Sequence, residues 1–127
     1  MYIGHTCIYV NDQERAKKFY CETLGWEVRN DVPMGDTRWL SVCPPGAQTG
    51  LVLMKGFGDW SPQKVGGDTG IALEVDDVFP LADKLKAAGV EFTREPEIAF
   101  FGAHAMIKDS EGNELLLHSP APAKATN

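Results

Sequence analysis

Residues 4–28 read GHTCIYVNDQERAKKFYCETLGWEV and predict a β-strand followed by a helix. The strand, expected over residues 2–10, is rich in β-branched and aromatic residues. Asn11 or Asp12 is a typical N-cap, apolar residues then recur at helical spacing, and Gly25 suits the left-handed conformation that ends a helix. A βαβββ unit is completed by further strands, expected over residues 26–30, 37–43 and 50–55.

The same order of elements restarts with TGIALEVDDVFPLADKLKAAGVEF, residues 69–92. Val75 and Asp77 match Val10 and Asp12 at an offset of 65 residues. Further strands are expected over residues 91–98, 102–108 and 114–119. This internal duplication predicts an α+β fold built from two tandem βαβββ modules. Neither module can bury its sheet face alone, so the two must share a core or exchange halves in a dimer.

The modules are expected to span about residues 1–55 and 69–119 of one domain, residues 1–120. The stretch 56–68 between them is rich in glycine and predicts a linker. Residues 121–127 read as a flexible tail.

Length, charge and cysteine content exclude several classes of function. A chain of 127 residues suits one compact domain, and a net charge of −6 argues against a nucleic-acid or anionic-membrane partner. No apolar run approaches the roughly 20 residues that cross a bilayer, and no secretory signal is evident. Three cysteines without a CxxC pair are typical of reduced thiols. We therefore expect a cytoplasmic protein.

Three motifs in a fixed order carry a family resemblance. They are H-x-x-x-x-V-x-D…FY…LG from His5 to Gly25, ALEVDD at residues 72–77 and KDSEGNELLL at residues 108–117. Together they resemble the vicinal oxygen chelate superfamily, which includes glyoxalase I, bleomycin-resistance proteins, fosfomycin-resistance enzymes and extradiol dioxygenases. The resemblance implies that the modules form a curled mixed-sheet cleft, often within a homodimer.

The resemblance also implies a test for a metal site, because metal-binding members place one ligand on the first and one on the last strand of each unit. His5 matches the first position, but its counterpart is Gly70, and Leu116 stands where a glutamate is expected. Strand 50–55 offers no carboxylate, histidine or glutamine. A divalent ion needs at least three protein ligands to be held well, so no metal and no other cofactor are expected. The alternatives are a divalent metal at the usual positions or at a different site drawn from His5, His104, His118, Glu114 and Glu74.

Strand alternation around His5 predicts which side chains face the cleft. Trp60 and Phe57, in the linker, are expected to form a lid over the cleft. The expected ligand-binding residues are His5, Cys7, Tyr9, Arg38, Leu40, Trp60, Glu74, His104, Met106 and Leu116. Ile8, Val10 and Trp39 are expected to pack beneath the helices. Arg38 and His104, at matching places in the two units, are the expected polar anchors for an anionic or carbonyl-bearing ligand.

Each polar candidate also has a structural interpretation. His5 could be a hydrogen-bonded strand histidine, His104 a solvated edge residue, and Arg38 the partner of a surface acid. Glu74 and His118 could be solvated at strand ends, and Trp60 could simply pack or lie in a dimer contact.

Two functions follow. The first is a metal-free homodimer that binds a small, partly aromatic molecule in the cleft. The alternative is a glyoxalase-like lyase or dioxygenase-type enzyme that uses a metal, or His5 or His104 as a general base. The catalytic residues are otherwise unknown.

Overall fold

The computed structural model describes residues 1–122. Contacts divide the chain into two compact units. The first unit contains Met1–Gly67 together with Ser110–Asn113, and the second contains Asp68–Asp109 together with the chain from Glu114 onward. Of the stretch 56–68, expected as a linker, residues 56–67 thus belong to the first unit. Most of the tail predicted at residues 121–127 lies outside the described residues.

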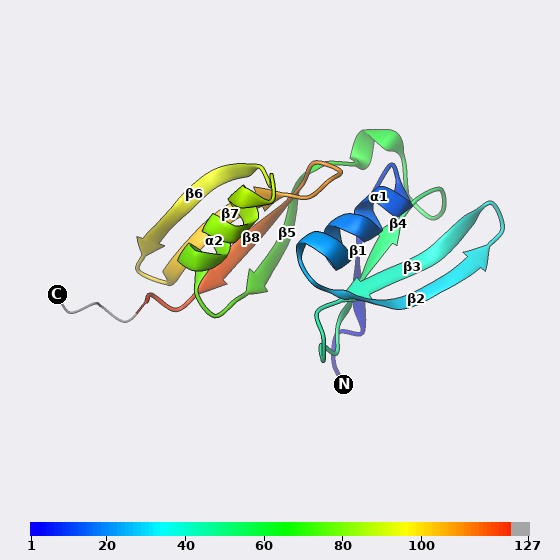
Figure 1. Ribbon diagram of the computed structural model, residues 1–127. Coiled ribbons are helices and arrows are strands. Elements are labelled where there is room, and N and C mark those ends of the chain that lie inside the picture. The colour runs from blue at the N-terminus through cyan, green and yellow to red at the C-terminus, as the bar shows by residue number, and fades with distance from the viewer. Residues whose placement is uncertain (123–127) are drawn as a thin grey trace. The chain divides into compact units, whose positions relative to one another are not determined.

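The first unit is a four-stranded sheet with a helix on one face (Figure 1). Its sheet order is β1-β4-β3-β2, with β1 parallel to β4 and the remaining pairs antiparallel. A short 3₁₀ helix, Pro62–Lys64, follows the last strand. The chain runs in the order β1 (His5–Tyr9), α1 (Gln13–Lys18), a π-helical turn (Phe19–Thr23), β2 (Glu27–Met34), β3 (Thr37–Cys43) and β4 (Gly50–Met54).

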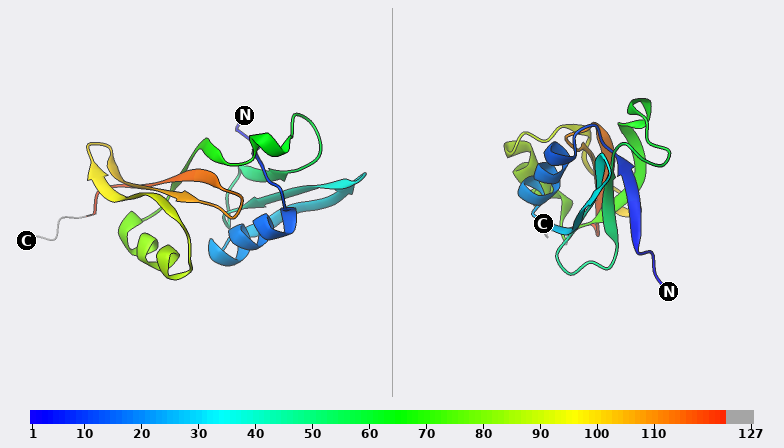
Figure 2. Two further views of the ribbon diagram at one scale, coloured as in Figure 1. Left: turned by 90° about the horizontal axis from the view of Figure 1, so that it is seen from above. Right: turned by 90° about the vertical axis from the view of Figure 1, so that its right-hand side faces the viewer.

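The second unit repeats this arrangement in the order β5-β8-β7-β6. In the views of Figures 1 and 2 each helix covers one face of the sheet in its own unit. The strands and helix of this unit are β5 (Gly67–Glu74), α2 (Val78–Ala87), β6 (Phe92–Ala99), β7 (Gly102–Lys108) and β8 (Asn113–Ser119). The prediction of two βαβββ modules in an α+β fold is therefore confirmed.

The helix caps form where the sequence predicts them. Asp12 accepts a hydrogen bond from the Arg15 amide at 2.9 Å, and Asp77 accepts one from the Phe79 amide at 3.1 Å. Gly25 follows the first helical segment with φ +77°. The first strand is shorter than expected, since β1 begins at His5 rather than at residue 2.

The core of each unit lies between the helix and the covered face of the sheet. In the first unit Ile8, Val10, Val42 and Leu53 are buried there, as the alternation of β1 predicts for Ile8 and Val10. The opposite face of each sheet carries no α-helix of its own unit. This face is called the open face below. Within residues 1–122 no helix is long and apolar enough to cross a membrane.

Candidate functional site

The open face of the first sheet is defined by the pairing of its strands. Cys7 on β1 lies opposite Val52 on β4, and Val52 lies opposite Ser41 on β3. Directly paired residues in a sheet share a face, so these three side chains lie with His5 on the open face. The prediction that His5, Cys7 and Tyr9 point away from the helix is confirmed by the burial of their neighbours Ile8 and Val10.

The prediction for β3 is wrong by one residue. Ser41 lies on the open face, so Trp39 does too, while Arg38 and Leu40 face the helix. Leu40 is fully buried. Arg38 Nη2 pairs with Glu14 Oε1 of α1 at 2.8 Å, and its Nε lies 3.1 Å from Asp31 Oδ1. Arg38 is thus the partner of surface acids, and neither Arg38 nor Leu40 lies on the open face.

A hollow of about 170 Å³ lies on this open face. Six side chains line it, those of His5, Arg29, Asn30, Trp39, Ser41 and Val52, with Gly4 and Gly50 between them. The His5 and Trp39 rings meet edge to face, with centroids 5.3 Å apart, and Phe57 lies 6.2 Å beyond Trp39. We call this hollow the β1–β3 pocket. Its walls combine the two aromatic rings with the polar groups of Arg29, Asn30 and Ser41.

Arg29 and Asn30 enter the pocket through a bulge in β2. Val28 pairs with Val42 and Asn30 with Ser41, so Arg29 is an extra residue without a partner on β3. Asn30 Oδ1 accepts a hydrogen bond from the Ser41 hydroxyl at 3.0 Å. Reasoning from the sequence missed both residues, because plain alternation cannot predict a bulge. Alternation along β3 would have identified Trp39 and Ser41 if the register of that strand had been predicted correctly.

The open face of the second sheet carries the other predicted residues. His104 pairs with His118 and Met106 with Leu116 across β7 and β8. Their neighbours Ala103, Ala105, Ile107 and Leu117 are buried against the helix side. The predicted register of β7 and β8 relative to the helix is therefore confirmed.

His104 is buried rather than solvated. Only 3% of the residue is exposed, because the Phe101 ring stacks on it at 5.0 Å. Its Nε2 lies 3.2 Å from Glu97 Oε1, and its Nδ1 has no hydrogen-bond partner among residues 1–122. The alternative of a solvated edge histidine is wrong.

His118 has an acceptor at each ring nitrogen. Nδ1 lies 2.6 Å from Glu74 Oε1, and Nε2 lies 2.6 Å from the Phe101 carbonyl oxygen. Only the protonated ring donates from both nitrogens. The Phe101 carbonyl, followed by Glu74, raises the pKa of His118 above its ordinary 6.5. Glu74 and His118 are thus each other's partners.

The residues at the four family metal positions do not fit a metal. His5 is a possible ligand, but Leu116 is aliphatic. The matching position in the first unit is Val52, because Val52 pairs with Ser41 as Leu116 pairs with Met106. Val52 is aliphatic too. Gly70 has φ +71°, a conformation that side-chain-bearing residues rarely adopt. Among residues 1–122 no three His, Cys, Asp or Glu side chains form a group that could hold a metal ion.

Trp60 has a partner in the first unit. Its indole Nε1 donates to the Val10 carbonyl at 2.8 Å, and the residue is half-buried. Tyr9 is also half-buried, with Lys64 Nζ 5.8 Å from its ring centroid. Trp60 therefore packs at the end of β1, and a role as a lid stays a prediction.

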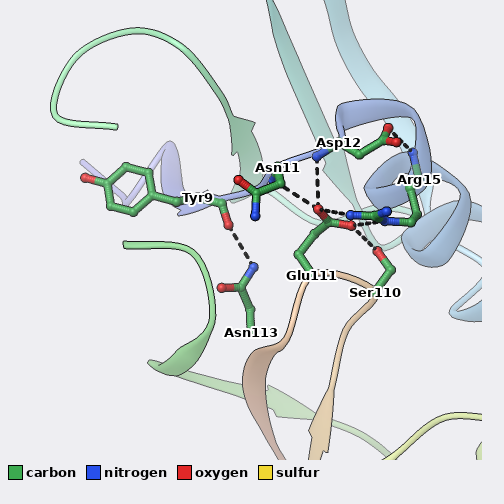
Figure 3. A network of polar contacts seen from close by, with 7 residues as sticks. All are labelled: Tyr9, Asn11, Asp12, Arg15, Ser110, Glu111 and Asn113. Carbon is green, nitrogen blue, oxygen red and sulfur yellow. Dashed lines mark hydrogen bonds and ion pairs between the residues drawn. The ribbon is translucent and has the colours of Figure 1, made fainter. Parts of the chain in front are cut away.

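A polar network in the first unit involves the turn between β7 and β8 (Figure 3). The Glu111 carboxylate accepts hydrogen bonds from the amides of Asn11 and Asp12 at 2.9 and 3.0 Å. Arg15 donates two more, from Nε at 2.7 Å and from Nη2 at 3.0 Å. Asn113 Nδ2 donates to the Tyr9 carbonyl at 2.9 Å. This segment therefore fixes the connection between β1 and α1, next to the strand that carries His5.

Comparison with known proteins agrees with this fold. Residues 2–117 match the family model described as Glyoxalase/Bleomycin resistance protein/Dioxygenase superfamily, and the chain belongs to this superfamily. It is similar to YetH of Bacillus subtilis (strain 168), with 39% identity over 117 residues that cover 91% of this chain and 95% of YetH.

Two further relatives have names that indicate a function. The crystal structure of TnmS3, an antibiotic binding protein from Streptomyces sp. CB03234, is 36% identical with a TM-score of 0.83, covering 95% of this chain and 97% of TnmS3. A probable lactoylglutathione lyase of Synechocystis sp. is 29% identical over 124 residues, covering 92% of this chain and 94% of the relative. The superfamily thus offers both a binding function and an enzymatic one for comparison.

Proposed function

We propose that this protein binds a small, partly aromatic molecule on the open faces of its sheets, without the divalent metal of the superfamily's enzymes. The observation that carries the proposal is the β1–β3 pocket, where the His5 and Trp39 rings meet edge to face and the Phe57 ring lies near Trp39. Burying an aromatic ring against such walls gains roughly 25 cal/mol per Å² of apolar surface. The likeness to an antibiotic binding protein supports the same function.

The second open face supplies further candidates for ligand contact. Met106 and Leu116 are partly exposed apolar residues there, beside the Phe101, His104 and His118 stack. Cys7 and Tyr9 extend the open face of the first unit along β1. The proposal includes a homodimer in the cytoplasm, and the three free cysteines support a reducing compartment.

The test is a thermal-shift screen of small aromatic compounds, followed by calorimetry on the hits. Trp39→Leu should weaken binding at least tenfold, about 1.4 kcal/mol, because it removes the aromatic wall of the pocket. Trp26→Leu is the matched control, since Trp26 contacts Tyr20 at 5.1 Å and Tyr20 is buried in the core. Hits that bind Trp39→Leu as tightly as the unaltered protein would show that this pocket is not the binding site.

The alternative function is a lyase, which the similarity to a probable lactoylglutathione lyase favours. The superfamily's metal chemistry needs ligands that Val52, Gly70 and Leu116 do not offer. We expect a hemithioacetal isomerase assay with added nickel or zinc to stay at background, and elemental analysis to find no stoichiometric metal. About one metal ion per chain, lost in His5→Ala, would contradict the metal-free proposal.

A further inference from the structure

The β1–β3 pocket contains one permanent charge among its lining residues, the guanidinium of Arg29. We infer that Arg29 makes this pocket select aromatic ligands that carry an anionic group, such as a carboxylate. The inference rests on the proposed function and adds the chemical class of the ligand. It differs from the expectation based on Arg38, whose charge faces the helix and is paired with Glu14.

The β-bulge explains why a cation reaches this pocket. In regular pairing the residue before Asn30 would lie on the opposite face of β2. The shift between Val28 and Asn30 leaves Arg29 unpaired, so two successive residues line the same hollow. Bulges commonly redirect a side chain in this way.

Backbone carbonyls hold the Arg29 side chain in place. Nη1 donates to the Gln48 carbonyl at 2.6 Å and to the Gly4 carbonyl at 3.3 Å. The side chain crosses β4 at Gly50, where an added Cβ would lie 3.1 Å from Nη1 and 3.2 Å from Cδ. A glycine at this position therefore gives the guanidinium its room. Carbonyl groups orient the cation but do not neutralise it.

The Nε and Nη2 side of the guanidinium has no protein acceptor in the described part of the chain. None of the ion pairs found among residues 1–122 includes Arg29. Two parallel N–H donors match the two oxygens of a carboxylate. An oriented guanidinium without an ion pair in the described residues, in a pocket that His5 and Trp39 also line, therefore fits a planar ring with an anionic substituent.

The net charge of −6 opposes an anionic ligand only at long range. At 0.15 M salt, charges further apart than about 8 Å are largely screened, whereas a group in contact with the ligand is not. Arg29 therefore determines the preference.

The experiment compares three ligands that share one ring, namely 2-naphthoate, 2-naphthamide and 2-naphthylmethylammonium. Calorimetry at pH 7 and 0.15 M salt should show the carboxylate binding at least tenfold more tightly than the amide, with the cation weakest. Arg29→Gln should abolish the difference between carboxylate and amide. Gly50→Ala should reduce it while keeping the charge, because Arg29 must then move.

Lys18→Gln is the matched control. It also removes one positive charge from the first unit, but from α1, and should leave the preference unchanged. Thermal unfolding of each variant checks that it is folded at the assay temperature. If Arg29→Gln does not fold, Arg29→Lys replaces it, and loss of the two-donor fork should still lower the preference.

Two results overturn the inference and are distinct from each other. Equal binding of carboxylate and amide, or a preference that survives the change of Arg29, refutes the selection of anions while the ring binding still supports the proposed function. If none of the three compounds binds, the proposed function fails for planar aromatic ligands, and the inference fails with it.

Discussion

The Glu111 side chain accepts hydrogen bonds from four residues of the first unit. Its carboxylate is fully covered and accepts hydrogen bonds from Asn11, Asp12, Arg15 and Ser110 (Figure 3). Charge-assisted bonds of this kind are stronger than neutral ones, and leaving their donors unpaired is costly. In the sequence Glu111 is only part of the motif KDSEGNELLL, because a contact between residues about 100 positions apart leaves no local pattern.

We predict that Glu111→Gln lowers the free energy of unfolding by about 1–3 kcal/mol, since the amide keeps the shape but loses the charge. Chemical denaturation measures the change. Glu22→Gln, at an exposed position in the π-helical turn, is the control and should have almost no effect. Equal stability of the two variants would contradict the structural role of Glu111.

The same carboxyl makes stability depend on pH. Burial raises the pKa of Glu111, but hydrogen bonds from Arg15, Asp12, Ser110 and Asn11 outweigh that effect and lower the pKa below its ordinary 4.5. A group with a depressed folded-state pKa stabilises the fold above the unfolded pKa and loses this contribution as the pH falls through the folded pKa. The stability difference between the unaltered protein and Glu111→Gln should therefore shrink below pH 4.5 and vanish in stronger acid.

His118 should behave in the opposite sense. Its pKa is raised by the Phe101 carbonyl and by Glu74, so the protonated ring is stabilised in the folded protein. This contribution is complete below pH 6.5 and is lost as the pH rises through the raised pKa. NMR titration should place the His118 pKa above 6.5, and Glu74→Gln should lower it. A His118 pKa at or below the ordinary value would refute this prediction.

At the scale of elements, the register of β3 is the feature that the sequence predicted wrongly. The helix caps, the helices and the order of the elements along the chain were predictable, because apolar periodicity and turn residues encode them locally. The error arose from matching Arg38 with His104, an offset of 66 residues. The two hairpin turns lie between Met34 and Thr37 and between Ala99 and Gly102, at an offset of 65. One residue of slip turns every side chain of a strand to the other face.

The corrected register predicts unequal effects along β3. Leu40→Ala should cost about 2–5 kcal/mol of stability, because Leu40 is fully buried beneath the helix. Ligand affinity should be unchanged in Arg38→Gln and reduced in Trp39→Leu. Chemical denaturation and calorimetry measure the two quantities. A small loss of stability in Leu40→Ala, together with a loss of ligand binding in Arg38→Gln, would support the register first predicted from the sequence and contradict the one that the structure shows.

At the scale of the whole molecule, large apolar side chains lie exposed on both units. Phe100, Phe101 and Ile98 lie in and beside the β6–β7 turn, and Val32 and Met34 lie on β2. Strands β1, β2, β5 and β6 are the edges of their sheets. Such surfaces and edges favour association.

We predict a homodimer for this reason. Light scattering at micromolar concentration should give about twice the chain mass of 13.9 kDa. A stable interface buries about 1,600 Å² in total, which the exposed apolar residues can contribute to. Light scattering of Phe100→Glu gives a second test. If Phe100 is buried in the dimer, a charge at this position should shift the equilibrium toward monomer. A monomer at all micromolar concentrations would rule out the prediction.

Fold and function were unequally predictable at this scale. The duplication and three motifs were enough for the superfamily, which the match over residues 2–117 confirms. The pocket was only partly predictable, since His5 follows from alternation whereas Arg29 depends on a bulge that no local sequence pattern marks. The ligand stays a prediction at every scale, because superfolds host many functions.

The segment Ser110–Asn113 belongs to the first unit although most of the second unit precedes it in the chain. During synthesis, a ribosome that has completed residue 67 has therefore not completed the first unit. Glu111 and Asn113 are synthesised about 100 residues after Tyr9, Asn11 and Asp12. Their hydrogen bonds to the backbone of these three residues cannot form before then. Contacts so distant in sequence slow folding, because a long loop must close before they can form. The unit that is begun first is thus completed only after most of the second unit has been synthesised.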